Sequence, residues 1–216
     1  MVTGVRRVLF RSQVGDKGVI KCGEAEFEVT NTEKTEGVFM HFGSFKTSKR
    51  FAKGDEVEML VDVKTRKATM RNHTATHLLQ KALQEIVGSH VKQAGSYVSP
   101  ERLRFDFTHF ESIPADVLEK IENRVNEEIL EALKVHTDIK SYDEAIKTGA
   151  MALFGEKYGD VVRIVNVGDY SKEFCGGTHI GNSSEIGLFT IVSESSAAAG
   201  VRRIEARVGL GAYEFV

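Results

Sequence analysis

The stretch Asn72-His-Thr-Ala-Thr-His-Leu-Leu-Gln-Lys-Ala-Leu-Gln-Glu-Ile-Val-Gly88 is the most informative part of this chain. Its apolar residues recur at helical spacing, which predicts a helix over residues 72–88 that stops at Gly88. At about 100° per residue, His77 follows His73 by about 40° around the helix axis. The two imidazoles therefore share one face, away from the middle of the apolar stripe. We expect them to face something other than the main core.

The region before this helix, residues 13–65, is rich in predicted strands. Alternating runs at residues 18–22, 26–29 and 56–63 are separated by Gly and Asn turns, and Gly54-Asp55 marks a turn before the last run. Several short strands at this spacing predict a small N-terminal β-barrel domain.

The region after residue 66 mixes strands and helices without a regular βαβ rhythm. We expect a helix from Pro114 to about Leu133 and a shorter one from Tyr142 to Thr148. Alternating or apolar runs predict further strands at residues 103–107, 160–167, 187–192 and 201–206. The class is therefore α+β, with a second domain over residues 66–216.

Composition is that of an ordinary globular protein, with 216 residues, 41% hydrophobic and 28% charged. No stretch approaches the roughly 18 apolar residues of a membrane span. Two cysteines, Cys22 and Cys175, are too few for a disulfide-rich secreted scaffold. We expect a cytoplasmic protein with no membrane partner.

The net charge of −2 does not by itself indicate a nucleic-acid-binding protein. Lys and Arg do cluster at residues 46–53, 64–71 and 202–207. Solvated surface is the simpler interpretation of each cluster, and an RNA-facing surface is the alternative.

Two short motifs predict a metal site. His73 and His77, four residues apart on a helix, lie about 5–6 Å apart on one side, so both can reach one ion. In Cys175-Gly-Gly-Thr-His179, the glycines permit a tight turn that directs thiolate and imidazole to the same place. The four side chains suit tetrahedral zinc. The alternative is a buried structural cysteine with unrelated histidines.

Three functional classes lack their defining residues. A zincin protease has Glu directly after its first His, where this chain has Thr74. A zinc deaminase requires a Cys-x-x-Cys pair, and Cys175 has no such neighbour. The phosphate-binding Walker loop is also missing from the sequence, so we expect no ATP binding.

Six strings carry a resemblance to a known family, among them Arg71-Asn-His-Thr-Ala-Thr-His-Leu-Leu79 and Phe174-Cys-Gly-Gly-Thr-His179. The others occupy residues 93–96, 100–107, 149–160 and 198–205. In this order they resemble the editing domain of alanyl-tRNA synthetase and its free-standing relatives, with the β-barrel that precedes it. The resemblance covers roughly residues 13–212. It implies the second-additional-domain fold of threonyl- and alanyl-tRNA synthetases for residues 66–216.

The resemblance implies a zinc-dependent aminoacyl-tRNA deacylase that hydrolyses mischarged Ser-tRNA(Ala) and, less often, Gly-tRNA(Ala). Editing is needed because one small group changes binding by only ~1–3 kcal/mol, too little for an alanine pocket to reject serine or glycine. The implied zinc ligands are His73, His77, Cys175 and His179. Four protein ligands would fill a tetrahedron, so zinc expands its shell, loses a ligand or mainly holds the substrate.

Other site residues follow from the same resemblance. Gln93 and the hydroxyls of Thr74 and Thr76 could bond the seryl hydroxyl or the attacking water. A solvated loop residue is the alternative for Gln93. Asp106 could hold a zinc-bound histidine, although a structural strand carboxylate is the favoured role.

Arg202 and Arg203 could bind phosphates near the acceptor end of tRNA for alanine. The alternative is an ion pair with Glu205 at a sheet edge. A non-catalytic tRNA-binding module with structural zinc is the rival to the enzyme, and a closed four-ligand site suits it.

Residues 1–12 do not fit the family. The glycine-rich entry expected before Gln13-Val-Gly-Asp16 is missing, and Leu9-Phe-Arg-Ser12 resembles a translated sequencing adapter. We expect this leader to be non-native. We also expect the chain to be a free-standing editor or a piece of a longer synthetase whose aminoacylation domain, expected upstream, is absent from the sequence.

Overall fold

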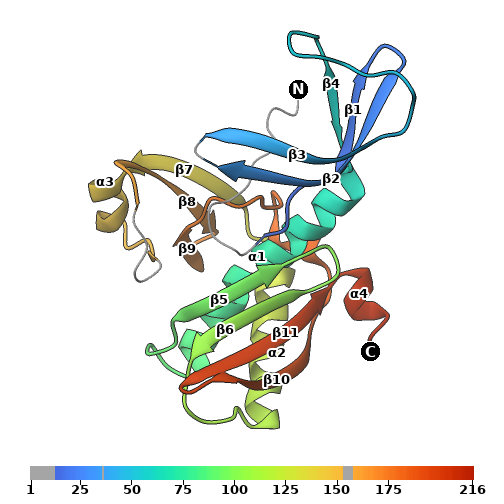
Figure 1. Cartoon of the computed structure of the whole chain (residues 1–216). Coiled ribbons are helices and arrows are strands. Elements are labelled where there is room, and N and C mark those ends of the chain that lie inside the picture. The colour runs from blue at the N-terminus through green and yellow to red at the C-terminus, as the bar shows by residue number, and fades with distance from the viewer. Residues whose placement is uncertain (1–12, 36, 153–157) are drawn as a thin grey trace.

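The computed structural model describes residues 13–35, 37–152 and 158–216. The expectation for residues 1–12 lies outside these ranges. Three antiparallel sheets and four α-helices make up the described part of the chain, so the predicted α+β class is confirmed (Figure 1).

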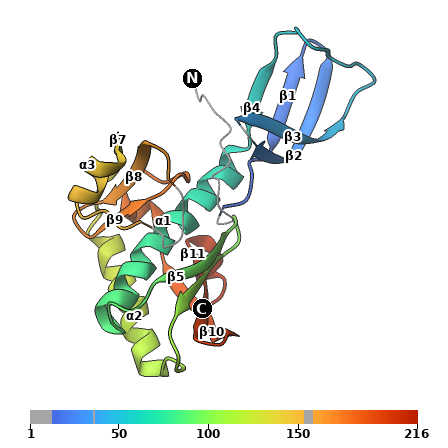
Figure 2. The ribbon, with the colours of Figure 1, turned by 60° about the vertical axis from the view of Figure 1, so that its left-hand side comes forward.

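The helix α1 (Val63–Ile86) connects the N-terminal sheet to the rest of the protein (Figure 2). It begins well before the predicted start at residue 72. Asp62 caps it, because Oδ1 accepts from the backbone N–H of Thr65 at 3.0 Å. The first turn is largely exposed and has no apolar stripe, so hydrophobic periodicity does not reveal it. The predicted stop at Gly88 is confirmed by its φ of 137°.

The N-terminal sheet consists of β1 (Gly18–Cys22), β2 (Ala25–Thr35), β3 (Val38–Phe45) and β4 (Glu58–Val61). Their order is β3-β2-β1-β4, and within the described residues the outer strands β3 and β4 do not pair. The predicted β-barrel is therefore wrong. Closed and partly open barrels use five or more strands, and four strands leave this sheet open.

The second sheet contains β5 (Gln93–Val98), β6 (Leu103–Thr108), β10 (Phe189–Ala198) and β11 (Val201–Val208), in the order β10-β11-β6-β5. The helix α2 (Ala115–Leu130) packs against α1, and Pro114 stands at its N-cap as expected. The short helix α4 (Leu210–Tyr213) follows β11. The strands predicted around residues 103–107, 187–192 and 201–206 are thus confirmed.

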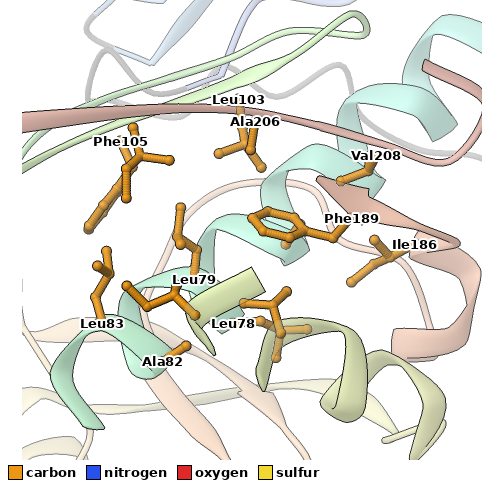
Figure 3. Packing of buried hydrophobic residues seen from close by; sticks show 14 of the residues in the cluster. Leu78, Leu79, Ala82, Leu83, Leu103, Phe105, Ile186, Phe189, Ala206 and Val208 are labelled. Atoms are coloured by element: carbon orange, nitrogen blue, oxygen red, sulfur yellow. The ribbon is translucent and has the colours of Figure 1, made fainter. Parts of the chain in front are cut away.

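The main core lies between α1, α2 and the second sheet. Leu78, Leu79 and Leu83 of α1 are fully buried, and Figure 3 shows them beside Phe105 and Phe189 of the sheet. Burying one such side chain contributes about 1.5–3 kcal/mol, so this contact fixes the face that α1 turns to the sheet. That choice also fixes where His73 and His77 point.

The third sheet contains β7 (Val135–Ser141), β8 (Val161–Val167) and β9 (Ser171–Phe174), in that order. The helix α3 (Tyr142–Lys147), where a helix was predicted, covers a small separate cluster. β9 leads directly into Cys175, and the 3₁₀ helix η1 (Ser183–Ile186) follows the Cys-His loop. This sheet therefore positions the second half of the predicted metal motif.

A short segment before β1 links the N-terminal sheet to the body of the protein. The backbone N–H of Val14 donates to the carbonyl of Val98 in β5 at 2.9 Å. The guanidinium of Arg66 in α1 forms an ion pair with Asp16. The sheet is thus attached through residues 13–17 as well as through α1.

Candidate metal centre

Four side chains from distant parts of the chain converge at one point. α1 supplies His73 and His77, and the loop after β9 supplies Cys175 and His179. One ligand atom from each lies within 4.8 Å of the others. Sγ of Cys175 is 3.4 Å from Nε2 of His73 and 3.3 Å from Nε2 of His179. The structure thus brings together all four predicted ligands.

These distances suit a tetrahedral metal ion. With bonds of about 2.0–2.1 Å to nitrogen and about 2.3 Å to sulfur, neighbouring ligand atoms should be about 3.3–3.6 Å apart. A sulfur–nitrogen pair should lie near the upper end of that range, about 3.6 Å. The two sulfur–nitrogen separations in the structure, 3.4 and 3.3 Å, are slightly shorter. The group could therefore hold a metal ion.

Burial and charge favour a thiolate in this group. Burial would raise the pKa of Cys175, but the imidazoles of His73, His179 and His77 hold it well below its usual value. Burial opposes the charged form of His77, yet Glu173 and Cys175 raise its pKa to about 10. Burial and the neighbouring His73 lower the pKa of His179 to about 3. The free site thus favours a thiolate at Cys175 beside a protonated His77.

Each imidazole is held by a contact at the ring nitrogen opposite its proposed ligand atom. Such contacts orient metal-binding histidines and set their tautomer. The three contacts are His73 Nδ1 to Gln13 Oε1 at 2.8 Å, His77 Nδ1 to Glu173 Oε2 at 2.8 Å, and His179 Nδ1 to Thr74 Oγ1 at 3.1 Å. Nε2 of all three rings is left for the ion.

The Cys175–His179 loop is shaped by one arginine and one glycine. Nη1 of Arg163 donates to the carbonyls of Cys175 at 2.8 Å and Gly177 at 2.7 Å. A Cβ at Gly177 would lie 1.9 Å from Cε1 of His73. Carbon atoms pack at about 3.5–4.0 Å, so any larger residue would collide with the ring. Glycine is required here by close approach.

The predicted polar residues Thr74, Thr76 and Gln93 differ in their contacts with the predicted metal ligands. The hydroxyl of Thr74 donates to the carbonyl of Met70 at 3.0 Å and contacts His179. The hydroxyl of Thr76 donates to the carbonyl of Asn72 at 2.9 Å, and the residue is 5% exposed. Gln93 begins β5 and is half-buried. Only Thr74 has a direct contact with a predicted ligand.

Arg202 and Arg203 lie on neighbouring positions of β11, each in a bidentate ion pair. Arg202 contacts Glu194 at 2.5 and 2.6 Å, and Arg203 contacts Asp106 at 2.6 and 2.8 Å. Asp106 therefore has the favoured structural role. Glu205, the partner considered for the arginines, pairs with Arg102 instead.

Sequence reasoning missed Gln13, Glu173 and Arg163 as parts of this centre. For Glu173 a signal exists, because Ser171, Glu173 and Cys175 alternate and share one side of an extended chain. Oγ of Ser171 donates to Glu173 Oε1 at 3.0 Å, which continues the contact from His77. Nothing local marks Gln13, since its partner His73 lies far along the chain.

Within the described residues, the structure contains no helix that is both long and apolar enough to cross a membrane. Residues 162–205 match the family described as Threonyl and Alanyl tRNA synthetase second additional domain.

The chain is also similar to part of several curated proteins. It is 56% identical over 205 residues to an alanine--tRNA ligase of Fervidobacterium nodosum and 54% identical over 205 residues to one of Clostridioides difficile. Each match covers 94% of this chain and 23% of the relative. The chain therefore spans less than a quarter of the length of these relatives.

Proposed function

Because the chain is homologous to the editing region of alanine--tRNA ligases, we propose that it hydrolyses, in the cytoplasm, tRNA for alanine that carries serine or, less often, glycine. The observation that carries this proposal is the convergence of His73, His77, Cys175 and His179 within 4.8 Å. The ester between amino acid and ribose would be the bond that breaks, and water would be the nucleophile.

Zinc is the ion we assign to this centre. A thiolate with three imidazoles is a zinc donor set, whereas magnesium and calcium favour oxygen ligands. When bound, zinc polarises a carbonyl or activates water. His73 and His77 are buried, and Cys175 and His179 are half-buried. The aminoacyl ester would therefore approach from the side of the Cys-His loop.

The remaining residues receive distinct roles under this proposal. Thr74 would act through His179, because its hydroxyl is engaged by that ring and by Met70. Gln93 is the proposed contact to the seryl hydroxyl or the attacking water. Thr76 is the weaker candidate for this contact, because its hydroxyl already donates a hydrogen bond to the carbonyl of Asn72.

Arg202 and Arg203 are proposed to meet phosphates of the acceptor end. Both guanidiniums already form ion pairs, Arg202 with Glu194 and Arg203 with Asp106. A phosphate would therefore bind each arginine alongside its carboxylate partner. Their replacement should then weaken tRNA binding and leave the zinc content unchanged.

The deciding experiment compares the parent chain with Cys175→Ala and with Cys22→Ala, the matched control in β1. Zinc content and the hydrolysis of seryl-, glycyl- and alanyl-tRNA for alanine are measured for each. We expect the parent and Cys22→Ala to cleave seryl-tRNA selectively. Cys175→Ala should lose zinc and about 100-fold or more of the activity, since even outer contacts of a metal site cost about 10–100-fold.

A second function is favoured by one observation, the four protein ligands that would close a tetrahedral shell. It is a tRNA-binding module whose zinc is structural. A folded, zinc-loaded parent that binds tRNA for alanine without hydrolysing seryl-tRNA would reject the deacylase and support this module.

A further inference from the structure

The side chain of Gln13 lies inside the metal centre, although its backbone belongs to the segment before β1. Oε1 of Gln13 is 2.8 Å from Nδ1 of His73 and 3.0 Å from the backbone nitrogen of Thr178. Nε2 of Gln13 donates to Oγ1 of Thr178 at 2.8 Å. One carboxamide thus touches both halves of the ligand set, the helix and the Cys-His loop.

These contacts determine the tautomer of His73. The backbone N–H of Thr178 can only donate, so the Gln13 atom that faces it must be the carbonyl oxygen. Nδ1 of His73 faces the same oxygen and must therefore carry a hydrogen. Nε2 is left with a free lone pair, and this is the atom 3.4 Å from Sγ of Cys175. A ring fixed in this way is ready to bind a metal through Nε2.

The backbone around Gln13 is held at several points. Gln13 forms a parallel bridge with Val98, and Val14 donates to the same residue at 2.9 Å. Three residues later, Asp16 is paired with Arg66 of α1 and accepts from Thr32 through its carbonyl. The carboxamide therefore extends from a segment whose backbone is anchored outside the ligand set.

We propose that Gln13 is a positioning residue of the metal centre, which holds His73 in the metal-binding tautomer and ties it to Thr178 in the loop that carries Cys175 and His179. This deepens the proposed function, since the metal it prepares is the one assigned to the deacylase. The segment that leads into the N-terminal sheet thereby becomes part of the metal site.

The test compares metal affinity in the whole chain among Gln13→Met, Gln13→Glu and Gln84→Met. Methionine keeps the length of the side chain and removes the amide. Glutamate keeps an acceptor for Nδ1–H of His73 and for the N–H of Thr178. Gln84 is the matched control, because its amide donates to the carbonyl of Val91 at 3.0 Å and is not in contact with the ligands.

Zinc affinity is measured by competition with a chromophoric chelator, and ligand geometry by the absorption bands of the cobalt-substituted protein. We expect Gln13→Met to bind zinc about 10–100-fold more weakly, with altered cobalt bands. Gln13→Glu and Gln84→Met should resemble the parent. Circular dichroism of the metal-free variants checks that Gln13→Met is folded.

A folded Gln13→Met variant with parental zinc affinity and parental cobalt bands would overturn the positioning role, as would a Gln84→Met variant that loses affinity equally. Seryl-tRNA hydrolysis by the parent is measured in parallel. A parent that binds zinc and hydrolyses nothing overturns the proposed function alone, because the affinity comparison among the variants still decides the role of Gln13.

Discussion

His77 and Glu173 form a buried contact, with Nδ1 of His77 2.8 Å from Oε2 of Glu173 and both side chains 7% exposed. Glu173→Gln removes the charge and keeps the shape. We expect zinc affinity to fall about 10–100-fold, because the carboxylate orients the ring and strengthens it as a ligand. Glu194→Gln removes an equally buried carboxylate from the Arg202 pair and should leave zinc affinity unchanged. Chelator competition measures both, and equal affinities in the two variants would contradict the role of Glu173.

Metal binding should depend on pH through His77. Its pKa is raised to about 10, so in the free site it keeps a proton that the ion must displace. Cys175 and His179 have lowered pKa values and are already deprotonated at neutral pH. Zinc affinity should therefore rise with pH, by about tenfold per unit between about pH 8 and 10, and level off above.

The measurement is a chelator competition at several pH values, combined with calorimetry in buffers of different ionisation enthalpy to count released protons. About one proton should leave with each zinc bound in that range. Affinity that stays constant between about pH 8 and 10 would show that His77 is already neutral in the free protein.

Gly177→Ala should disable the metal centre with little effect on the fold. The new Cβ would lie 1.9 Å from Cε1 of His73, so the ring or the loop must move. Gly159→Ala is the control, since a Cβ there meets no atom within 4 Å among the residues that the structure describes. We expect loss of zinc and of the tetrahedral cobalt spectrum in Gly177→Ala only. Parental zinc binding by this variant would mean that the His73 ring can shift without cost.

Leu79→Ala should destabilise the protein by about 2–5 kcal/mol, because Leu79 is fully buried and its loss leaves a cavity beneath the sheet. Leu130→Ala, at a position 82% exposed, should change stability by no more than about 0.5 kcal/mol. Urea unfolding monitored by circular dichroism measures both. Similar midpoints for the two variants would mean that the core around α1 can collapse to fill the space.

The sequence predicted those features of the site that depend on local spacing. The pair His73 and His77 follows from helical periodicity, and the Cys175–His179 pair from its glycine turn. Gln13 and Glu173 could not be found in this way, because each meets its histidine only through tertiary contacts. The alternation of Ser171, Glu173 and Cys175 is a signal for Glu173, but it is weak because the strand is only four residues long, from Ser171 to Phe174.

The α+β class was predicted correctly, but the closure of the N-terminal sheet and the start of α1 were not. The barrel failed because closure depends on pairing between the outermost strands, β3 and β4, and short alternating runs carry no information about partners. The start of α1 was missed because the turn after Asp62 bridges two parts of the molecule and buries no stripe. Hydrophobic periodicity reveals a helical segment that buries one face, and it does not reveal a segment that is exposed on most sides.

The double attachment of the N-terminal sheet has a mechanical consequence. A sheet joined to the rest of a protein by one segment can rotate about it, whereas this sheet is joined by two, α1 and residues 13–17. These two segments are joined to each other by the Asp16–Arg66 ion pair and by the hydrogen bond from the Asp62 N–H to the Lys17 carbonyl at 2.9 Å. Two connections that are also bonded to each other restrict the rotation of the sheet relative to the rest of the protein. A displacement of the sheet, for example by a docked macromolecule, would therefore move both α1, which carries His73, and the segment that carries Gln13. The position of the sheet would then be mechanically coupled to the geometry of the metal centre.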